Sequence, residues 1–155
     1  MQRPAWPRCV FVSSAISINR PVIHHAAAQR VAGAAVAKAE ALGINVCVAV
    51  VDSSARLVAY LRMPNTFLIS DEVSVAKAKS VASAAGLPAD VLDAALTGEG
   101  PWVREGLLNI PGFTLIRGAL PLRDGAALIG AVGVSGGSEA QDLLCAEAAI
   151  AALHS

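Results

Sequence analysis

The sequence has few charged residues and no excess of either sign, which limits the partners that the protein can bind. Lys and Arg together number 12, Asp and Glu also number 12, and charged residues make up 15% of the 155 residues. A chain of this charge, without a basic stripe, is poorly suited to neutralise a phosphate backbone. We therefore expect no nucleic-acid partner.

Long apolar runs are also missing, although hydrophobic residues reach 55% of the chain and the mean hydropathy is +0.57. No uninterrupted apolar stretch approaches the roughly 18 residues that a membrane-spanning helix needs. The apolar excess must then be buried in the core or against another copy of the chain, which predicts a homo-oligomer without a membrane span.

Cysteine is scarce, and its spacing excludes two common kinds of scaffold. Cys9, Cys47 and Cys145 are odd in number and have neither CxxC nor zinc-ligand spacing. This pattern favours a reducing, cytoplasmic location, with Cys47 and Cys145 as core residues. The first residues faintly resemble a secretory signal, but their apolar core, CVFV, is too short, so secretion is kept only as an alternative.

The length bounds the domain count. A chain of 155 residues can bury about two thirds of its unfolded surface around one core. We predict an N-terminal tail at residues 1–19 and a single domain at residues 20–155.

Hydrophobic periodicity predicts alternating helices and strands. Apolar residues fall on one helical face in 21–42, and two β-branched runs, 44–52 and 55–63, are separated by turn residues and form a hairpin. Ser70 is predicted to cap a helix that ends near Gly86, and Pro88 to open a further short helix.

The C-terminal half contains more glycine and proline. Residues 96–113 read as a shaped loop with room for one helical turn, and 113–137 as two or three strands with a hairpin at Asp124-Gly125. Ser138 and Gln141 match a capping box, so the last helix begins there and runs to about residue 153. Adjacent strands joined by tight turns indicate an α+β sandwich with an antiparallel sheet covered by helices.

Three blocks in this order carry a resemblance to a known family: AVVDSSARLVAYLRM, SDEVSVAKAKSVASA and DGAALIGAVGVSGGSEAQD. Together they resemble the GlcG/HbpS family, the haem-associated domain that also forms the C-terminal part of PduO-type proteins. The resemblance covers residues 20–153. It implies a profilin- or PAS-like sandwich, with an antiparallel five-stranded sheet flanked by helices, that assembles into homo-oligomers.

Two departures from the family pattern bear on the ligand. Where the family has Asp-x-Gly-Gly in the first hairpin, this chain has Asp52-Ser53-Ser54-Ala55, and where it often has Gly-Gly-x-Pro, this chain has Gly118-Ala119-Leu120-Pro121. The second change adds a methyl group where backbone could approach a ligand.

The resemblance implies a small-molecule ligand, with haem or a related tetrapyrrole as the first choice and haem as the implied cofactor. The alternative is a small enzyme of hydrolase, lyase or isomerase type, acting on a small carboxylate or an aromatic-catabolism intermediate in a pocket lined by Arg62 and Lys77. Whether the protein is an enzyme stays open at this point.

Arg62 and Lys77 are the candidate anion-binding residues, since both fall where the family has the same residue type. Arg62 could grip a carboxylate bidentately or pair with Asp71 or Asp52, and Lys77 could bind a carboxylate or a propionate or be solvated. Asp71 and Glu99, with Lys77, are the candidate catalytic residues for proton transfer in the enzyme alternative.

His24 and His25 are adjacent in the first helix, so only one of them could be an axial haem ligand. Trp102 and Phe113 flank the irregular loop and could form an apolar wall for a planar ligand, or simply bury the loop. Backbone at Ser135, Gly136 and Gly137, before the last helix, is the remaining candidate contact; it lacks the spacing of a nucleotide-binding loop.

Overall fold

The computed structural model describes residues 16–155, so most of the predicted tail, and Cys9 with it, lies outside the described residues. The helices are α1 (His25–Ala41), α2 (Ser70–Ser83), α3 (Ala89–Thr97), α4 (Pro101–Leu108) and α5 (Glu139–Ala151). The strands are β1 (Cys47–Asp52), β2 (Leu57–Arg62), β3 (Ala119–Asp124) and β4 (Ala127–Ser135).

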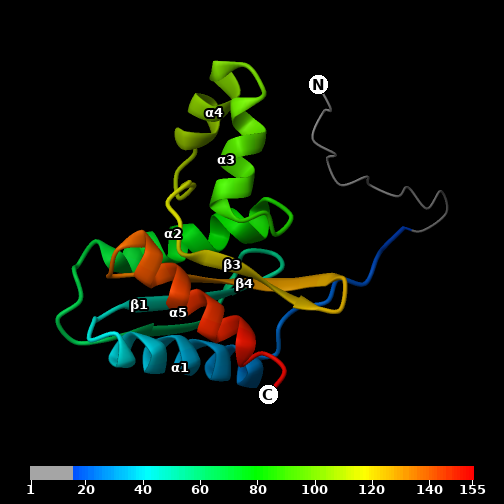
Figure 1. The fold of residues 1–155 in the computed structure, drawn as a ribbon. Helices are drawn as coiled ribbons and strands as arrows, with labels where there is room; N and C mark the ends of the chain where they lie inside the picture. Colours follow the sequence, from blue (N-terminus) through cyan, green and yellow to red (C-terminus); the bar gives the residue numbers. More distant parts are fainter. Residues whose placement is uncertain (1–15) are drawn as a thin grey trace.

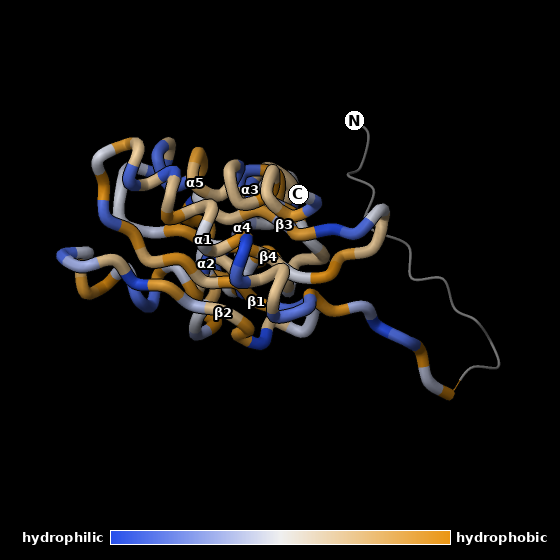
Figure 2. The backbone as a smooth tube through the Cα atoms, turned by 90° about the horizontal axis from the view of Figure 1, so that it is seen from below, coloured by the Kyte–Doolittle hydropathy of each residue, from blue (hydrophilic) through white to orange (hydrophobic). Residues whose placement is uncertain are grey.

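The four strands form one antiparallel sheet in the order β2-β1-β4-β3. Helices α1 and α5 pack side by side on one face, and α2 covers the other (Figure 1). The central strands β1 and β4 carry the most hydrophobic stretches of the sheet (Figure 2). The predicted α+β sandwich is therefore confirmed.

Alternation along β1 explains how the two faces differ. Val48 and Val50 point to the face covered by α1 and α5, whereas Ala49 and Val51 point to α2. On the α2 face the neighbouring strand offers Gly133, where an added Cβ would lie 2.3 Å from the Ser74 carbonyl oxygen. Small residues on this face thus let α2 lie directly on the sheet.

The expected fifth strand is absent from residues 16–155, and the segment before β3 shows why. The amide of Thr114 donates to the Ser80 hydroxyl, that of Ile116 to the Thr114 hydroxyl, and that of Arg117 to the Glu139 carboxylate. Backbone donors that a strand would give to a neighbouring strand are here satisfied by side chains. Residues 113–118 are consequently an irregular connection and not a strand.

Two further expectations are corrected by the helices. The predicted loop at 96–113 contains α4, an eight-residue helix with Pro101 in its first turn, and α3 and α4 stand away from the sheet (Figure 1). Ser70 is the first residue of α2 and not its cap. The N-cap position of α2 is Ile69, which makes no side-chain capping bond. The hairpin of β1 and β2, the turn at Gly125 and the capping box of Ser138 and Gln141 are confirmed.

Within residues 16–155, every helix is too short or too polar to cross a lipid bilayer. Cys47 and Cys145 are buried free thiols, as predicted.

Candidate functional site

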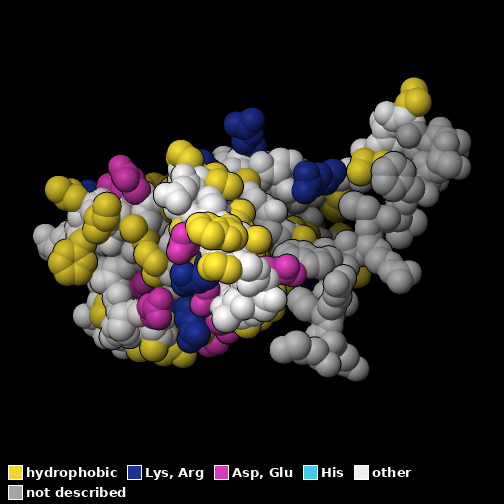
Figure 3. Space-filling model, turned by 90° about the horizontal axis from the view of Figure 1, so that it is seen from above, with side chains coloured by type: hydrophobic (Ala, Val, Ile, Leu, Met, Phe, Trp, Pro, Cys, Tyr) yellow, Lys and Arg dark blue, Asp and Glu magenta, His cyan; other side chains and the backbone are white. Residues whose placement is uncertain are grey.

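Two open hollows adjoin each other along the outer side of α2. The first, of about 510 Å³, lies between α2 and β2, and the second, of about 540 Å³, lies between α2, the β1–β2 turn and the α3–α4 hairpin. Lys79 and Gly112 line both. We call the two hollows together the α2 groove. On the side of the molecule from which α3 and α4 project, exposed hydrophobic side chains alternate with charged ones (Figure 3).

A polar cluster closes one end of the α2 groove. The Oδ1 atom of Asp71 accepts hydrogen bonds from the Cys47 thiol at 3.1 Å and the Tyr60 hydroxyl at 2.9 Å, and lies 3.1 Å from the Arg62 Nε. Cys47 and Ala49 of β1 lie opposite Arg62 and Tyr60 of β2, so all four residues share the face that α2 covers. Of the two ion-pair partners predicted for Arg62, Asp71 and Asp52, the structure shows Asp71.

The contacts within this cluster shift the pKa values of Asp71, Tyr60 and Cys47. Hydrogen bonds from Cys47 and Tyr60 and the nearby Arg62 guanidinium hold the pKa of Asp71 below its usual value. Burial, followed by hydrogen bonding within the cluster, raises the pKa of the Tyr60 hydroxyl, and burial raises that of the Cys47 thiol. Asp71 is therefore ionised at neutral pH, and it is a weaker base than an ordinary carboxylate.

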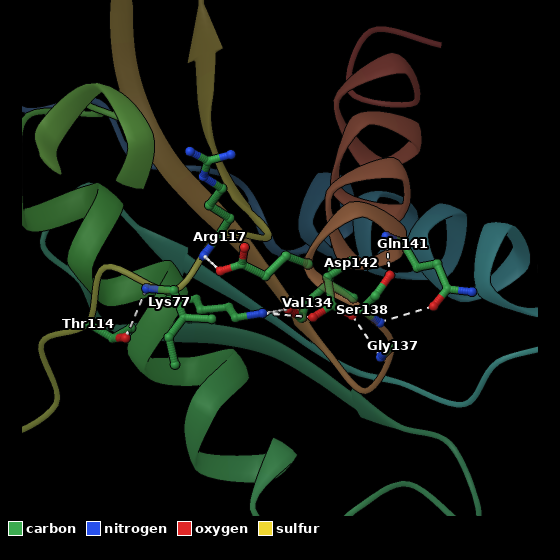
Figure 4. A network of polar contacts seen from close by, with 10 residues as sticks. Lys77, Thr114, Arg117, Val134, Gly137, Ser138, Gln141 and Asp142 are labelled. Atoms are coloured by element: carbon green, nitrogen blue, oxygen red, sulfur yellow. Dashed lines mark hydrogen bonds and ion pairs between the residues drawn. The ribbon is translucent and has the colours of Figure 1, made fainter. Parts of the chain in front are cut away.

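Lys77 faces away from the groove, into the protein. Its side chain is 1% exposed, and its Nζ donates to the Asp142 Oδ2 and to the Val134 carbonyl oxygen, each at 2.8 Å (Figure 4). Of the two alternatives left open for Lys77, the solvated lysine is wrong. A ligand contact stays a prediction, and it would require this buried pair to open.

The backbone amides just before α5 also donate their hydrogen bonds within the protein. The Gly137 amide donates to the Asp142 Oδ1 at 2.9 Å, and the Ser138 amide to the Gln141 side chain at 3.0 Å (Figure 4). An added Cβ at Gly136 would lie 2.2 Å from the Asn45 carbonyl oxygen, and Ser135 is buried. This segment serves the turn from β4 into α5.

The two histidines lie on the opposite side of the sheet from α2. Their rings are 4.2 Å apart, yet they line separate hollows. The Nδ1 atom of His24 accepts a hydrogen bond from the Ala26 amide, so His24 caps the N-terminus of α1. His25 is exposed and lines a hollow of about 360 Å³ between α1 and β2, where no hydrogen bond to another described residue engages its ring.

The remaining predicted site residues are dispersed. Phe113 lines the α2 groove, but Trp102 on α4 is 80% exposed and does not. Glu99 lies exposed between α3 and α4, away from Asp71 and Lys77. No group of three or more His, Cys, Asp or Glu in residues 16–155 is arranged to hold a metal ion.

Sequence reasoning missed Tyr60, Lys79 and Asp142. Tyr60 lies two positions before Arg62 in a strand, so both share a face, and that spacing was a usable signal. Lys79 follows Glu72, Val75 and Ala76 at helical spacing, which marks the outer side of α2. Asp142 gave no local signal, since its partner lies 65 residues away in the chain.

Comparisons with known proteins agree with this fold. An uncharacterised 15.0 kDa protein from the dhaT-dhaS intergenic region of Citrobacter freundii is 34% identical over 125 residues, 81% of this chain and 87% of that protein. The structure of Klebsiella pneumoniae ORFY matches with a TM-score of 0.82 at 30% identity, over 91% of this chain and 97% of that one.

A further solved structure, a PduOC:heme complex, matches with a TM-score of 0.75 at 29% identity, over 84% of this chain and 94% of that one. The sequence also matches the family described as haem degrading protein HbpS-like over residues 23–151. The chain belongs to this HbpS-like family.

Proposed function

We propose that this protein binds haem or a related tetrapyrrole through His25. The observation that carries the proposal is an exposed imidazole, free of hydrogen bonds to the described residues, beside the hollow between α1 and β2. The relation to a haem complex of PduOC supports the ligand class. Haem, when bound, supplies an iron that accepts an imidazole nitrogen.

The walls of the His25 hollow are mainly apolar, as a flat apolar ring would require. Besides His25 and Gln29, the lining is formed by Ala32 of α1 and by the β2 residues Val58, Ala59, Tyr60 and Leu61. The next residue, Arg62, engages Asp71 through Nε, and its two terminal nitrogens make no hydrogen bond to a described residue. Arg62 lies on the face of the sheet that α2 covers, so it points away from this hollow, whose lining contains no Lys or Arg.

The hollow lies along the open edge strand β2, so the other side of the ring has to be covered by something else. A second copy of the chain would supply that cover, in agreement with the homo-oligomer expected from the apolar composition.

The enzyme alternative has less support, because the residues it needs are not brought together. Lys77 is held in a buried ion pair, Asp71 is a weak base, and Glu99 lies on a separate exposed connection. A pocket lined jointly by Arg62 and Lys77 is not formed within the described residues, since Lys77 points to α5.

A haemin titration of the purified protein, followed in the Soret region, tests the proposal. We expect a saturable spectral shift at one haem per chain in the unchanged protein, and loss of the iron-ligand signature in His25→Ala. His24→Ala is the matched control, since it removes the neighbouring imidazole, which lines a separate hollow, and should keep the spectrum. A non-saturating response would exclude haem as the bound molecule, and a His25→Ala spectrum equal to that of the unchanged protein would exclude His25 as the iron ligand.

A further inference from the structure

We infer that the α2 groove is a separate binding site for an amphipathic carboxylic acid, with its carboxylate at Lys79 and Arg56 and its apolar part among the leucines of α3 and α4. This site lies on the α2 side of the sheet, whereas His25 lies with α1 on the other side. The inference does not depend on haem binding.

The larger part of the groove is apolar and drawn from several elements. Leu92 and Leu96 of α3, Leu107 of α4, and Ile110 and Phe113 of the following connection line it. Leu92 and Leu96 are only 5% and 2% exposed, so they form its floor, whereas Ile110 is 51% exposed at its rim. Such a surface gains free energy when an alkyl chain or an aromatic ring covers it.

A hydrogen bond anchors the wall of the groove and preforms it. The Thr114 amide donates to the Ser80 hydroxyl at 2.9 Å, and that hydroxyl donates to the Ala76 carbonyl oxygen at 2.8 Å. The connection that carries Ile110 and Phe113 is thereby attached to α2 next to Lys79. A ligand would not have to order this wall itself, which lowers the entropic cost of binding.

The charges along the groove determine which charge the ligand carries and how it is oriented. Lys79 and Arg56 are exposed and make no ion pair with a described residue. The opposite end carries Glu72 and the ionised Asp71. An anion is therefore attracted to the middle of the groove and repelled from that end, which leaves the leucine-lined part for the apolar portion of the ligand.

The fluorescent anion 1-anilinonaphthalene-8-sulfonate is a suitable probe, with octanoate as the competing ligand and octylamine as its cationic counterpart. We expect octanoate, and not octylamine, to displace the dye saturably. Lys79→Gln and Arg56→Gln should each weaken octanoate binding about fivefold, the upper range for losing one solvent-exposed ion pair. Ser83→Glu, an exposed position in the same lining, should weaken it as well.

Lys38→Gln is the matched control, because it removes a lysine from α1 on the other side of the sheet and should leave octanoate binding unchanged. Haemin binding should also be unchanged in Lys79→Gln. The inference is overturned if octylamine competes as well as octanoate, if Lys79→Gln binds octanoate like the unchanged protein, or if haemin displaces octanoate from the groove.

Discussion

At the scale of single residues, the pairing of Lys77 with Asp142 has the largest structural consequence. Both side chains are almost fully buried, and the pair joins α2 to α5 across the end of β4. A buried charge is tolerated only when its partners satisfy it, and Asp142 is satisfied by Lys77 and by the Gly137 amide. Gly118 provides the space, since an added Cβ there would lie 2.9 Å from the Lys77 Nζ.

We predict that Lys77→Met lowers the free energy of unfolding by about 3 kcal/mol or more, because it leaves Asp142 buried without its counter-charge. The double variant Lys77→Met/Asp142→Leu should recover most of this loss, since it removes both buried charges. Lys79→Met, on the exposed side of the same helix, should stay within about 0.5 kcal/mol of the unchanged protein. Urea unfolding of the three variants measures these differences, and a double variant no better than Lys77→Met would contradict the explanation.

The residue-scale site was only partly predictable from the sequence. The ion pair of Arg62 with Asp71 was predicted as one of two alternatives. Arg62 ends β2 and Asp71 lies in the first turn of α2, so the short connection between them can bring the two side chains together. The burial of Lys77 was not foreseen, since it depends on the packing of α5, which follows 65 residues later. A lysine in an alanine-rich helix looks the same in sequence on either side of that helix.

At the scale of elements, the close approach of α2 to β4 depends on glycine at one position. An added Cβ at Gly133 would lie 2.3 Å from the Ser74 carbonyl oxygen and 2.6 Å from the Ala78 amide nitrogen. Both neighbours are helix backbone, so the helix as a whole would have to move. The Asp71 cluster and the α2 groove are both built on this helix and depend on the same contact.

We predict that Gly133→Ala lowers the free energy of unfolding by about 3 kcal/mol, the upper range for an overpacked interior. Gly33→Ala makes the same chemical change in α1, where an added Cβ would meet nothing within 4 Å, and should raise the stability by about 0.5–1 kcal/mol. Thermal unfolding followed by circular dichroism compares the two. Equal effects of the two substitutions would show that α2 does not pack as closely as described.

Local signals predicted most elements, and the failures have physical causes. The capping box of α5 and the turn at Gly125 are encoded by residues next to one another, and both were confirmed. Helix α4 was missed, since the glycines and prolines around it indicate a loop, whereas Pro101 occupies a first helical turn where proline is tolerated. The expected fifth strand failed because side chains of α2 and α5 satisfy the amides of residues 113–118.

At the scale of the whole molecule, the two edges of the sheet differ. The edge strand β3 contains Pro121, which has no amide hydrogen and discourages pairing with a further strand. The other edge strand, β2, has no proline and exposes Leu57 and Leu61. Phe67, Leu68 and Ile69 follow it and are 72%, 78% and 63% exposed. An open, apolar edge of this kind is suited to association with another chain.

We predict that the protein forms a homo-oligomer through the β2 edge and that Leu61→Lys shifts it to the monomer, because the substitution places a charge among the apolar residues of that edge. Leu144→Lys is a closely matched control, since Leu144 on α5 is 41% exposed and Leu61 is 42% exposed. Size-exclusion chromatography with light scattering gives the mass of each variant. The prediction would be contradicted if the unchanged protein were monomeric. It would also be contradicted if Leu144→Lys dissociated the oligomer while Leu61→Lys left it intact. Since Leu61 itself lines the hollow beside His25, Leu61→Lys should weaken haemin binding as well, both by dissociation and by the charge placed in the hollow.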